Sequence, residues 1–253
     1  MAACADSQLA EAAQAHGLPP DVRCIACSEY YLVVEFGRSL SLDVNAQAAA
    51  FAAHLRAAGH RCITDLVPAL ASVGVHYRPD LAPARDGELP HVAMRRLVAE
   101  AFATFKPTAA VSGDALVIPV CYGGEFGPDL EAVAQHCGLT PDEVVDLHTQ
   151  TTAVVLMLCF APGHSQLGLW DERLNIGRRS TPRMQLAAGS VAIANRQTVI
   201  YPFVVPGGWN VIGRTPLKMF DPDRENPCLL SPGMSVRFEP IAADRFDEWV
   251  SRS

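Results

Sequence analysis

The segment formed by residues 118–130 constrains the fold more than any other part of the chain. An apolar, strand-like run leads into the turn Gly123-Gly-Glu-Phe-Gly127, and a helix start follows directly. Glycine permits tight turns and a close approach of backbone to a ligand, and Glu125 brings a carboxylate to the same place. The segment is therefore either a plain strand-to-helix connector or one wall of a binding site.

Residues 20–120 alternate between strand and helix patterns. β-Branched and aromatic residues predict strands over residues 30–36, 63–67, 73–77 and 116–120, and apolar periodicity predicts helices over 46–58 and 92–105. Asn45 is the expected N-cap of the first helix, and Gly59 is its expected stop. The order βαββαβ is the split βαβ pattern of ferredoxin-like folds, in which both helices pack on one face of an antiparallel sheet.

The rest of the chain is rich in short strands separated by Gly and Pro. After two short helices, strands are predicted over residues 153–160, 190–194, 199–205, 209–212 and 235–239. Several short strands with turn signals between them indicate a closed barrel or a sandwich. The predicted fold class is α+β, with an N-terminal ferredoxin-like βαββαβ domain over residues 1–115 and a β-barrel domain over residues 116–253.

Composition excludes several classes of function. The 253 residues are 49% apolar and 19% charged, with a formal net charge of −7, which indicates a folded core and offers no basic surface for nucleic acid. The longest apolar run, residues 153–161, is shorter than the roughly 20 residues of a membrane helix. Residues 1–17 are expected to form a frayed polar helix rather than a secretory signal. The eight cysteines lie mostly in apolar segments, which indicates reduced thiols and a cytoplasmic protein.

Three short motifs are incomplete. Cys24-Ile-Ala-Cys27 has the spacing of a zinc or redox site, but no second pair of ligands completes it, so no metal site is predicted. Residues 130–147 resemble a helix-turn-helix whose second helix carries acidic residues and neither Lys nor Arg, which argues against DNA binding. Residues 208–215 have the glycine spacing of a P-loop, with Arg214 instead of lysine. Contact of Arg214 with phosphate and a simple β-turn both stay open.

His148 and Arg183 are candidate site residues with ordinary alternatives. His148 ends an acidic helix, where it could act as an acid or base, or could be a capping or core histidine. Arg183 belongs to a basic run that either neutralises a carboxylate or phosphate or forms a solvated loop. Ser165 lies in a GxSxxG pattern, one residue too long for a nucleophile elbow, so it is not expected to be a nucleophile.

A set of segments, taken in order along nearly the whole chain after about residue 25, is similar to one known family. The matching segments are Val33-Val-Glu-Phe-Gly37, Thr64-Asp-Leu-Val-Pro68, residues 118–130, Asp146-Leu-His-Thr149, Phe160-Ala-Pro-Gly163, Pro182-Arg183, Ala188-Gly-Ser-Val191, Gln197-Thr198, Tyr201-Pro202, Pro206-Gly-Gly-Trp209 and Ile212-Gly-Arg-Thr-Pro216. They resemble the group that contains the B-type subunit of 5-oxoprolinase, allophanate hydrolase subunit 1 and Kip-type kinase inhibitors, with carboxyltransferase subdomains C and D. The resemblance implies that the second domain is a cyclophilin-like β-barrel.

The resemblance also implies a function within a complex. The implied activity is that of a subunit of an ATP-dependent 5-oxoprolinase, which opens the lactam of 5-oxoproline to glutamate. ATP, with Mg, is implied as a co-substrate, and no tightly bound cofactor is expected. The implied partners are a second barrel subunit, of the C-type in 5-oxoprolinase or of the allophanate hydrolase subunit 2 type, and a third subunit. Two alternatives stay open: a non-catalytic regulator that binds and inhibits a sensor histidine kinase, and a subunit of an allophanate or urea amide hydrolase system.

On the matching positions, the resemblance implies catalytic roles for Glu125, His148 and Arg214. Arg214 would face anionic oxygens, and Glu125 or His148 would handle protons or orient the substrate. Substrate or nucleotide binding is implied for Arg183, Gln197, Tyr201, Gly207, Gly208 and Trp209. The chain departs from the family pattern in having His164-Ser165-Gln166, and in having Ala192, Asn195 and Val199 in place of glycines. These departures keep the regulator alternative open.

Overall fold

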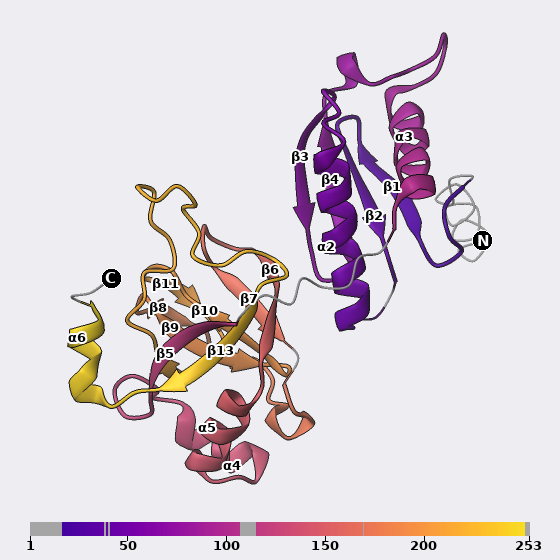
Figure 1. Ribbon diagram of the computed structural model, residues 1–253. Helices are drawn as coiled ribbons and strands as arrows, with labels where there is room; N and C mark the ends of the chain where they lie inside the picture. The colour runs from indigo at the N-terminus through magenta and orange to yellow at the C-terminus, as the bar shows by residue number, and fades with distance from the viewer. Residues whose placement is uncertain (1–16, 38, 40, 107–114, 169, 251–253) are drawn as a thin grey trace. The chain divides into compact units, whose positions relative to one another are not determined.

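The computed structural model describes residues 17–37, 39, 41–106, 115–168 and 170–250 (Figure 1). The polar helix expected over residues 1–17 lies outside these residues, apart from Gly17. The chain divides into two compact units, Met1–Ala110 and Val111–Ser253. Within the described ranges, every helix is too short or too polar to cross a membrane.

Unit 1 is a four-stranded antiparallel sheet with two helices. Its strands, in spatial order, are β1 (Arg23–Ser28), β2 (Tyr31–Glu35), β4 (Ser72–Tyr77) and β3 (Ile63–Pro68). The helices are α2 (Leu42–Ala57) and α3 (Pro90–Thr104), with the 3-10 helix η1 (Pro79–Leu81) between β4 and α3. Apolar side chains from both helices and from alternate strand positions form one core, so both helices cover the same face of the sheet.

Unit 2 is a closed barrel with two helices packed against it (Figure 1). Its strands, in spatial order, are β10 (Gln197–Ile200), β7 (Ser165–Gly168), β6 (Ala153–Leu158), β13 (Ser235–Pro240), β5 (Leu116–Tyr122), β12 (Asn210–Arg214) and β9 (Ser190–Ala194). β13 and β5 are parallel, and the other neighbouring pairs are antiparallel. The remaining elements are α4 (Leu130–Cys137), α5 (Pro141–Gln150), η2 (Glu172–Leu174), η3 (Ala243–Arg245), α6 (Phe246–Val250) and the two-stranded sheet of β8 (Arg183–Leu186) and β11 (Val205–Gly207).

The strand predicted to complete the βαββαβ order belongs to the barrel instead. β5 pairs with β13 and β12 in unit 2, and the edge of the sheet in unit 1 is occupied by β1. The sequence pattern does not reveal β1 readily, because Cys24 and Cys27 suggest a metal-site motif there. In β1, Cys24 is buried and Cys27 is exposed. Burial raises the pKa of Cys24 to about 12, so this thiol stays protonated. Unit 1 therefore has the order ββαββα.

The N-terminal cap of α2 is Ser41, not Asn45. The Oγ of Ser41 accepts a hydrogen bond from the N–H of Val44 at 3.1 Å. Asn45 lies inside the helix, where its Nδ2 donates to the carbonyl oxygen of Ala69 at 3.2 Å. Asn45 thus ties α2 to the turn between β3 and β4, a distant acceptor that capping preferences cannot reveal. The predicted stop at Gly59 is confirmed, since this residue follows the C-cap in the left-handed region, with φ of 63°.

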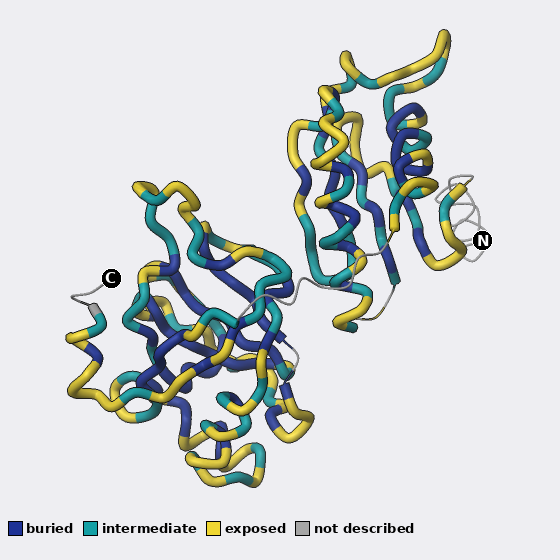
Figure 2. The backbone as a smooth tube through the Cα atoms, viewed as in Figure 1, coloured by how far each residue is buried: buried dark blue, intermediate teal, exposed yellow. Residues whose placement is uncertain are grey.

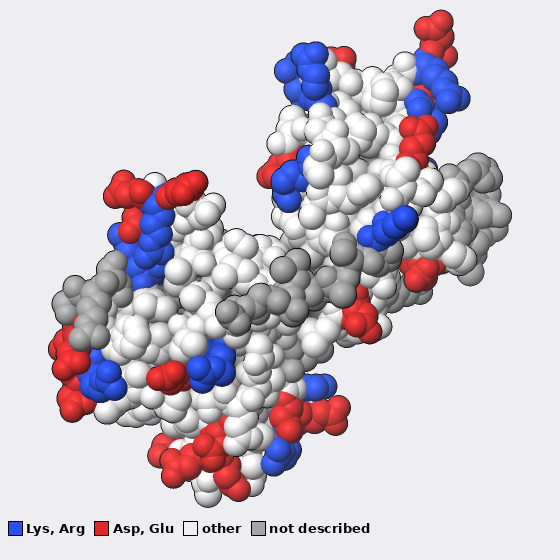
Figure 3. Space-filling view, viewed as in Figure 1, with Lys and Arg blue, Asp and Glu red and all other residues white. Residues whose placement is uncertain are grey.

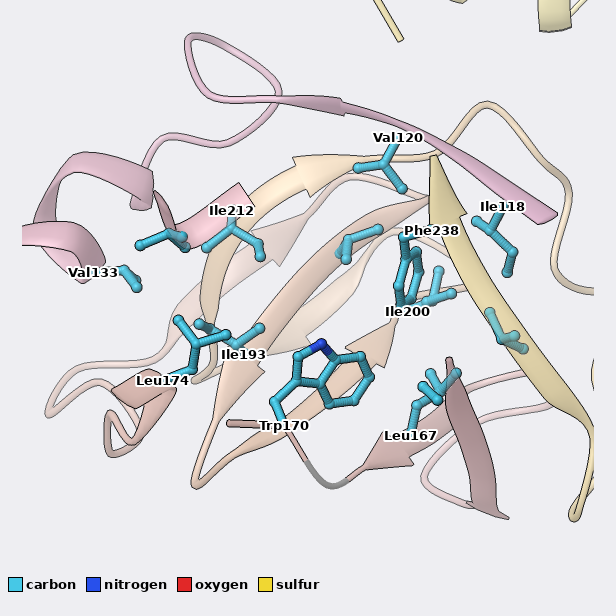
Figure 4. Packing of buried hydrophobic residues seen from close by; sticks show 14 of the residues in the cluster. Ile118, Val120, Val133, Leu167, Trp170, Leu174, Ile193, Ile200, Ile212 and Phe238 are labelled. Atoms are coloured by element: carbon cyan, nitrogen blue, oxygen red, sulfur yellow. The ribbon is translucent and has the colours of Figure 1, made fainter. Parts of the chain in front are cut away.

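The barrel interior is filled by apolar side chains. Figure 4 shows Leu167, Trp170, Ile193, Ile212 and Phe238 pointing toward one another from different strands and loops. In Figure 2 the barrel strands are buried along much of their length. Because the interior is packed, a site for a ligand has to be sought at the ends of the barrel or on its outer face.

Candidate anion-binding site at one end of the barrel

The glycine turn after β5 is fixed against β12. The N–H of Gly123 donates to the carbonyl oxygen of Ile212 at 3.1 Å, and the N–H of Gly127 donates to that of Gly123 at 2.8 Å. A Cβ at position 127 would lie 2.0 Å from the carbonyl oxygen of Ile212, so only glycine permits this approach. Glu125 is exposed within the turn. The turn therefore holds a carboxylate at the solvent-exposed surface of the barrel.

Substitution of Gly127 tests this close approach. We expect Gly127→Ala to lower the free energy of unfolding of the barrel unit by about 1–3 kcal/mol, because the added methyl group forces the turn away from β12. Gly177→Ala is the matched control, because a Cβ there meets nothing within 4 Å, and we expect a change of about 0.5 kcal/mol or less. Urea unfolding of both variants checks the prediction, and equal midpoints would contradict it.

Arg214 is the last residue of β12, and two contacts hold its guanidinium. The Nε donates to the carbonyl oxygen of Ala188 at 2.8 Å, and the Cζ lies 5.5 Å from the centroid of the Phe246 ring. Within the described residues, no carboxylate forms an ion pair with Arg214. Its remaining N–H donors are therefore available to an anionic ligand.

Arg214 lines a depression of about 310 Å³ in unit 2. The lining residues are Ala188, Gly189, Pro202, Arg214, Thr215, Pro216, Leu217, Lys218 and Phe246. They include two cations, Arg214 and Lys218, and no carboxylate, and Lys218 forms an ion pair with Asp221 at 3.0 Å. Gly189 has φ of 80°, and a Cβ there would lie 2.2 Å from the carbonyl oxygen of Thr215, so the wall requires glycine. A depression with this charge suits a phosphate or carboxylate group.

A second depression, of about 290 Å³, lies in unit 1 between α2 and β3. Two of its polar side chains are already engaged, because Arg56 donates to the carbonyl oxygen of Leu66 at 3.0 Å and Asp65 accepts from the N–H of Leu66 at 2.7 Å. The depression at Arg214 is therefore the stronger candidate for a ligand site.

Arg183 is bound to a buried carboxylate, Asp129. The two nitrogens Nη1 and Nη2 of Arg183 donate to Asp129 at 2.6 and 2.8 Å, Arg179 donates at 2.7 Å, and the N–H of Val211 donates at 2.8 Å. Burial raises the pKa of Asp129, but the bonds from Arg183 and Val211 and the charges of both arginines outweigh it and lower this pKa below its ordinary 3.8. The cluster joins the start of α4 to β12. Sequence reasoning missed Asp129, although it lies directly after the glycine turn.

His148 lies inside the barrel, away from the residues that line the depression. Its Nδ1 is 2.8 Å from the Oη of Tyr122, its Nε2 is 2.9 Å from the Oγ1 of Thr198, and its ring stacks on Trp170 at 5.0 Å. Burial lowers the pKa of His148 to about 3, so the imidazole is neutral at pH 7. This placement is that of a core histidine, the alternative that the sequence left open.

Acid unfolding tests the burial of His148. Below pH 6.5 an unfolded histidine binds a proton, whereas the native His148 stays neutral. The free energy of unfolding therefore decreases as the pH is lowered, by about 1.4 kcal/mol per pH unit, down to the native pKa near 3. His164, whose pKa burial lowers to about 4, adds a loss of the same sign. We expect His148→Gln to reduce the slope between pH 6 and pH 5 by about 1.4 kcal/mol per unit.

The control for this measurement is His136→Gln, at an exposed position on α4. It should keep the slope of the unmodified protein when urea unfolding is followed at each pH. A slope unchanged by His148→Gln would show that His148 is not neutral and buried in the folded protein.

Several predicted binding residues meet on the outer face of the barrel. Tyr201 and Trp209 share an apolar cluster with Leu186 of β8, which covers this face. A Cβ at Gly207 would lie 2.5 Å from the Oη of Tyr201, so glycine is needed for the contact. Gly208 lies next to the ring of Pro182, with 3.6 Å between its would-be Cβ and that ring.

Polar residues that sequence reasoning did not assign to a site join this cluster. Gln166 donates from Nε2 to the Oε1 of Gln197 at 2.6 Å, and the Sγ of Cys159 donates to Gln166 at 3.6 Å. The ring of His164 lies 5.0 Å from that of Tyr201. The available signal was His164-Ser165-Gln166, which appeared only as a departure from the family pattern.

The predicted site residues therefore fall into separate places. Arg214 lines the depression, Glu125 is exposed on the glycine turn, and His148 is in the barrel interior. Arg183 is paired with Asp129, and Gly208 lies beside Pro182. The outer face of the barrel holds Gln197, Tyr201, Gly207 and Trp209. On the face of the described residues seen in Figure 3, basic and acidic side chains are interspersed. A small anion-binding depression is thus better supported than an extended basic surface.

Comparison with known proteins gives the class of the chain. Residues 22–230 match the family described as carboxyltransferase domain, subdomain C and D, and the chain belongs to this family. It is 38% identical over 227 residues to the B-type subunit of 5-oxoprolinase from Bacillus subtilis (strain 168), a match that covers 88% of this chain and 94% of the relative. It is 53% identical over 123 residues to the B-type subunit of 5-oxoprolinase from Escherichia coli O157:H7, covering 49% of this chain and 56% of the relative.

Solved structures agree with the fold. TTHA0988 has a TM-score of 0.73 at 33% identity, and the match covers 84% of this chain and 40% of that chain. The conserved uncharacterized protein PH0987 from Pyrococcus horikoshii has a TM-score of 0.52 at 35% identity, with 88% of this chain and 99% of that chain covered. The urea carboxylase of Kluyveromyces lactis has a TM-score of 0.69 at 15% identity, which shows a shared fold alone. This chain spans less than half of the TTHA0988 chain.

Proposed function

We propose that this chain is a subunit of an ATP-dependent 5-oxoprolinase that opens the lactam of 5-oxoproline to glutamate. The observation that carries the proposal is the match to the 5-oxoprolinase B-type subunit of Bacillus subtilis along 94% of that protein. The depression at Arg214 supports it, since both 5-oxoproline and ATP carry anionic oxygens. The chain acts only with partner subunits, because the depression supplies charge but no paired acid and base.

The contribution of this chain to the reaction is charge neutralisation and positioning of the substrate. A lactam is a poor electrophile. Transfer of the γ-phosphoryl group of ATP to the lactam oxygen releases ADP and activates the ring carbon. Water then adds to this carbon, the C–N bond breaks to free the amine, and a second water releases phosphate from the resulting acyl phosphate to leave glutamate. Arg214 neutralises negative charge on the carboxylate or phosphoryl oxygens and fixes their position. Glu125, exposed on the glycine turn, is the residue proposed to orient the substrate or accept a proton. His148 has both ring nitrogens engaged in the core, so we assign it no proton transfer.

ATP enters this proposal as a co-substrate accompanied by Mg²⁺. The lining of the depression fits phosphate oxygens through Arg214, while Lys218 forms an ion pair with Asp221 at 3.0 Å. The lining contains no carboxylate, the side chain that Mg²⁺ prefers. In the described part of the chain, no group of three or more His, Cys, Asp or Glu residues is arranged to hold a metal ion. We therefore assign this chain contact with anionic oxygens and leave Mg²⁺ to ATP and to the other subunits.

The proposed partners are a second barrel subunit and a third subunit in the cytoplasm. The Bacillus subtilis relative is itself named as one subunit among several, which supports assembly with other subunits. Within the two units, we propose that the sheet of unit 1 is a variant of the ferredoxin-like arrangement, with β1 at the edge. We further propose that the barrel is cyclophilin-like and that the domain boundary falls between residues 115 and 116.

Complementation tests the proposed function. A Bacillus subtilis strain that lacks its own B-type subunit of 5-oxoprolinase should use 5-oxoproline as its nitrogen source when it expresses this chain together with the chain's natural partner subunits. Growth only when this chain is present is the expected result. Absence of growth, combined with tight binding of the purified chain to a histidine kinase dimerisation domain, would favour the regulator alternative.

A further inference from the structure

We propose that the C-terminal helix α6 completes the anion site, with Phe246 as a positioning residue that holds Arg214 for a carboxylate- or phosphate-bearing ligand. The inference rests on the proposed function for the identity of the ligands, and on geometry for the site itself. The match to the family model ends at residue 230, so α6 lies beyond the matched residues. Figure 1 shows α6 at the end of the chain beside the barrel.

Phe246 is placed between two parts of the candidate site. Its ring centroid lies 4.8 Å from that of Phe126 in the glycine turn and 5.5 Å from the guanidinium carbon of Arg214. Phe246 is 8% exposed, and it lines the depression together with Arg214 and Lys218. One aromatic ring thus connects the turn that carries Glu125 to the cation that faces the ligand.

The ring restricts how Arg214 can move. The hydrogen bond from its Nε to Ala188 fixes one edge of the guanidinium, and attraction between the cation and the ring of Phe246 fixes its plane. A long side chain that is already ordered loses less conformational entropy when it binds a ligand. Phe246 should therefore raise the affinity for the anion without touching the reacting atoms.

The barrel does not require α6 for its strands. β13 ends at Pro240 after pairing with β5 and β6, and the N–H of Ile241 still donates to the carbonyl oxygen of Val120 at 2.9 Å. Only η3 and α6 follow within the described residues. A chain that ends at Ala242 should keep the barrel and lose the ring beside Arg214.

The ligand is defined by its charge and geometry. A guanidinium binds a carboxylate and a phosphate with similar paired hydrogen bonds, and no lining carboxylate repels either group. In the proposed reaction, the carboxylate would come from 5-oxoproline and the phosphate from ATP. The two sources are distinguished by which Michaelis constant changes when Phe246 is replaced.

The experiment uses the reconstituted complex and five forms of this chain: unmodified, Phe246→Ala, Phe246→Leu, Phe246→Tyr and the chain ending at Ala242. Phe246→Ala should raise the KM of one ligand roughly fivefold and change kcat less, because a positioning contact of this kind is worth about 1 kcal/mol. Phe246→Tyr should keep the KM of the unmodified complex, since it keeps an aromatic face. Phe246→Leu, which fills the volume without that face, should raise the KM as Phe246→Ala does. A raised KM for ATP identifies the phosphate, and a raised KM for 5-oxoproline identifies the carboxylate.

Two results would overturn the inference. One is unchanged KM values for both ligands in Phe246→Ala and in the chain ending at Ala242, and the other is a KM in Phe246→Leu equal to that of the unmodified complex. Failure of the proposed function is a separate outcome, in which the unmodified complex has no turnover. In that case, titration of the isolated chain with inorganic phosphate and with 5-oxoproline still decides. Weaker binding of one probe by Phe246→Ala than by Phe246→Tyr supports the inference, and equal binding or no binding of either probe overturns it.

Discussion

Asp129→Asn is expected to lower the free energy of unfolding of the barrel unit by about 2–4 kcal/mol. The carboxylate is buried and accepts hydrogen bonds from Arg179, Arg183 and the backbone of Val211. Loss of its charge leaves two arginines without their partner. Breaking a buried pair costs about 3–5 kcal/mol, and the value is reduced here because both arginines are about one third exposed and can be hydrated.

The matched control is Glu239→Gln, which removes an exposed ion pair with Arg237 in the same unit. This pair spans 3.8 Å and should contribute about 0.5 kcal/mol or less. Urea unfolding at pH 7, followed by a signal from the barrel unit, compares the two variants. If Asp129→Asn unfolds at the same urea concentration as the control, Asp129 is not the buried centre of this cluster.

Arg214→Ala is expected to lower kcat/KM of the reconstituted complex about a hundredfold. Removing one donor that stabilises developing negative charge commonly costs a factor of about 10²–10³, and Arg214 is the cation in the depression that has no carboxylate partner in the described residues. Arg214→Lys should recover part of the loss, because it restores charge without the planar pair of donors.

Arg237→Ala is the control for the loss of a positive charge, since Arg237 lies on β13 and is about half exposed. It should leave kcat/KM close to that of the unmodified complex. Thermal unfolding of each variant shows whether the barrel is intact. An unfolding temperature and a kcat/KM that both stay unchanged in Arg214→Ala would remove Arg214 from the proposed site.

Much of the secondary structure follows from local sequence signals. Strands β3 and β4 and helix α3 lie where β-branched residues and apolar periodicity predict them. The errors come from partners distant in sequence. The sequence of β5 predicts a strand, but only tertiary pairing assigns it to the barrel. Asn45 resembles an N-cap in the sequence, and the cap prediction fails because the acceptor of its side chain lies 24 residues away.

The candidate site was less predictable for the same reason. The glycine-rich segment around Arg214 indicates a candidate site residue, and in the structure Arg214 lines a depression. Arg183 has a similar local sequence, but its guanidinium forms an ion pair with Asp129, 54 residues earlier. His148 looks reactive at the end of an acidic helix, whereas the barrel packs aromatic rings around it. Short motifs indicate which side chains could react, and the fold decides which of them are free to do so.

Release of phosphate and glutamate by a complex of this chain with its two natural partner subunits tests its assignment as a 5-oxoprolinase subunit. With 5-oxoproline and ATP supplied, we predict that both products form in equal amounts and that neither forms when this chain is omitted. Phosphate release that does not depend on 5-oxoproline, or glutamate formation at the same rate without this chain, would contradict its assignment as a 5-oxoprolinase subunit.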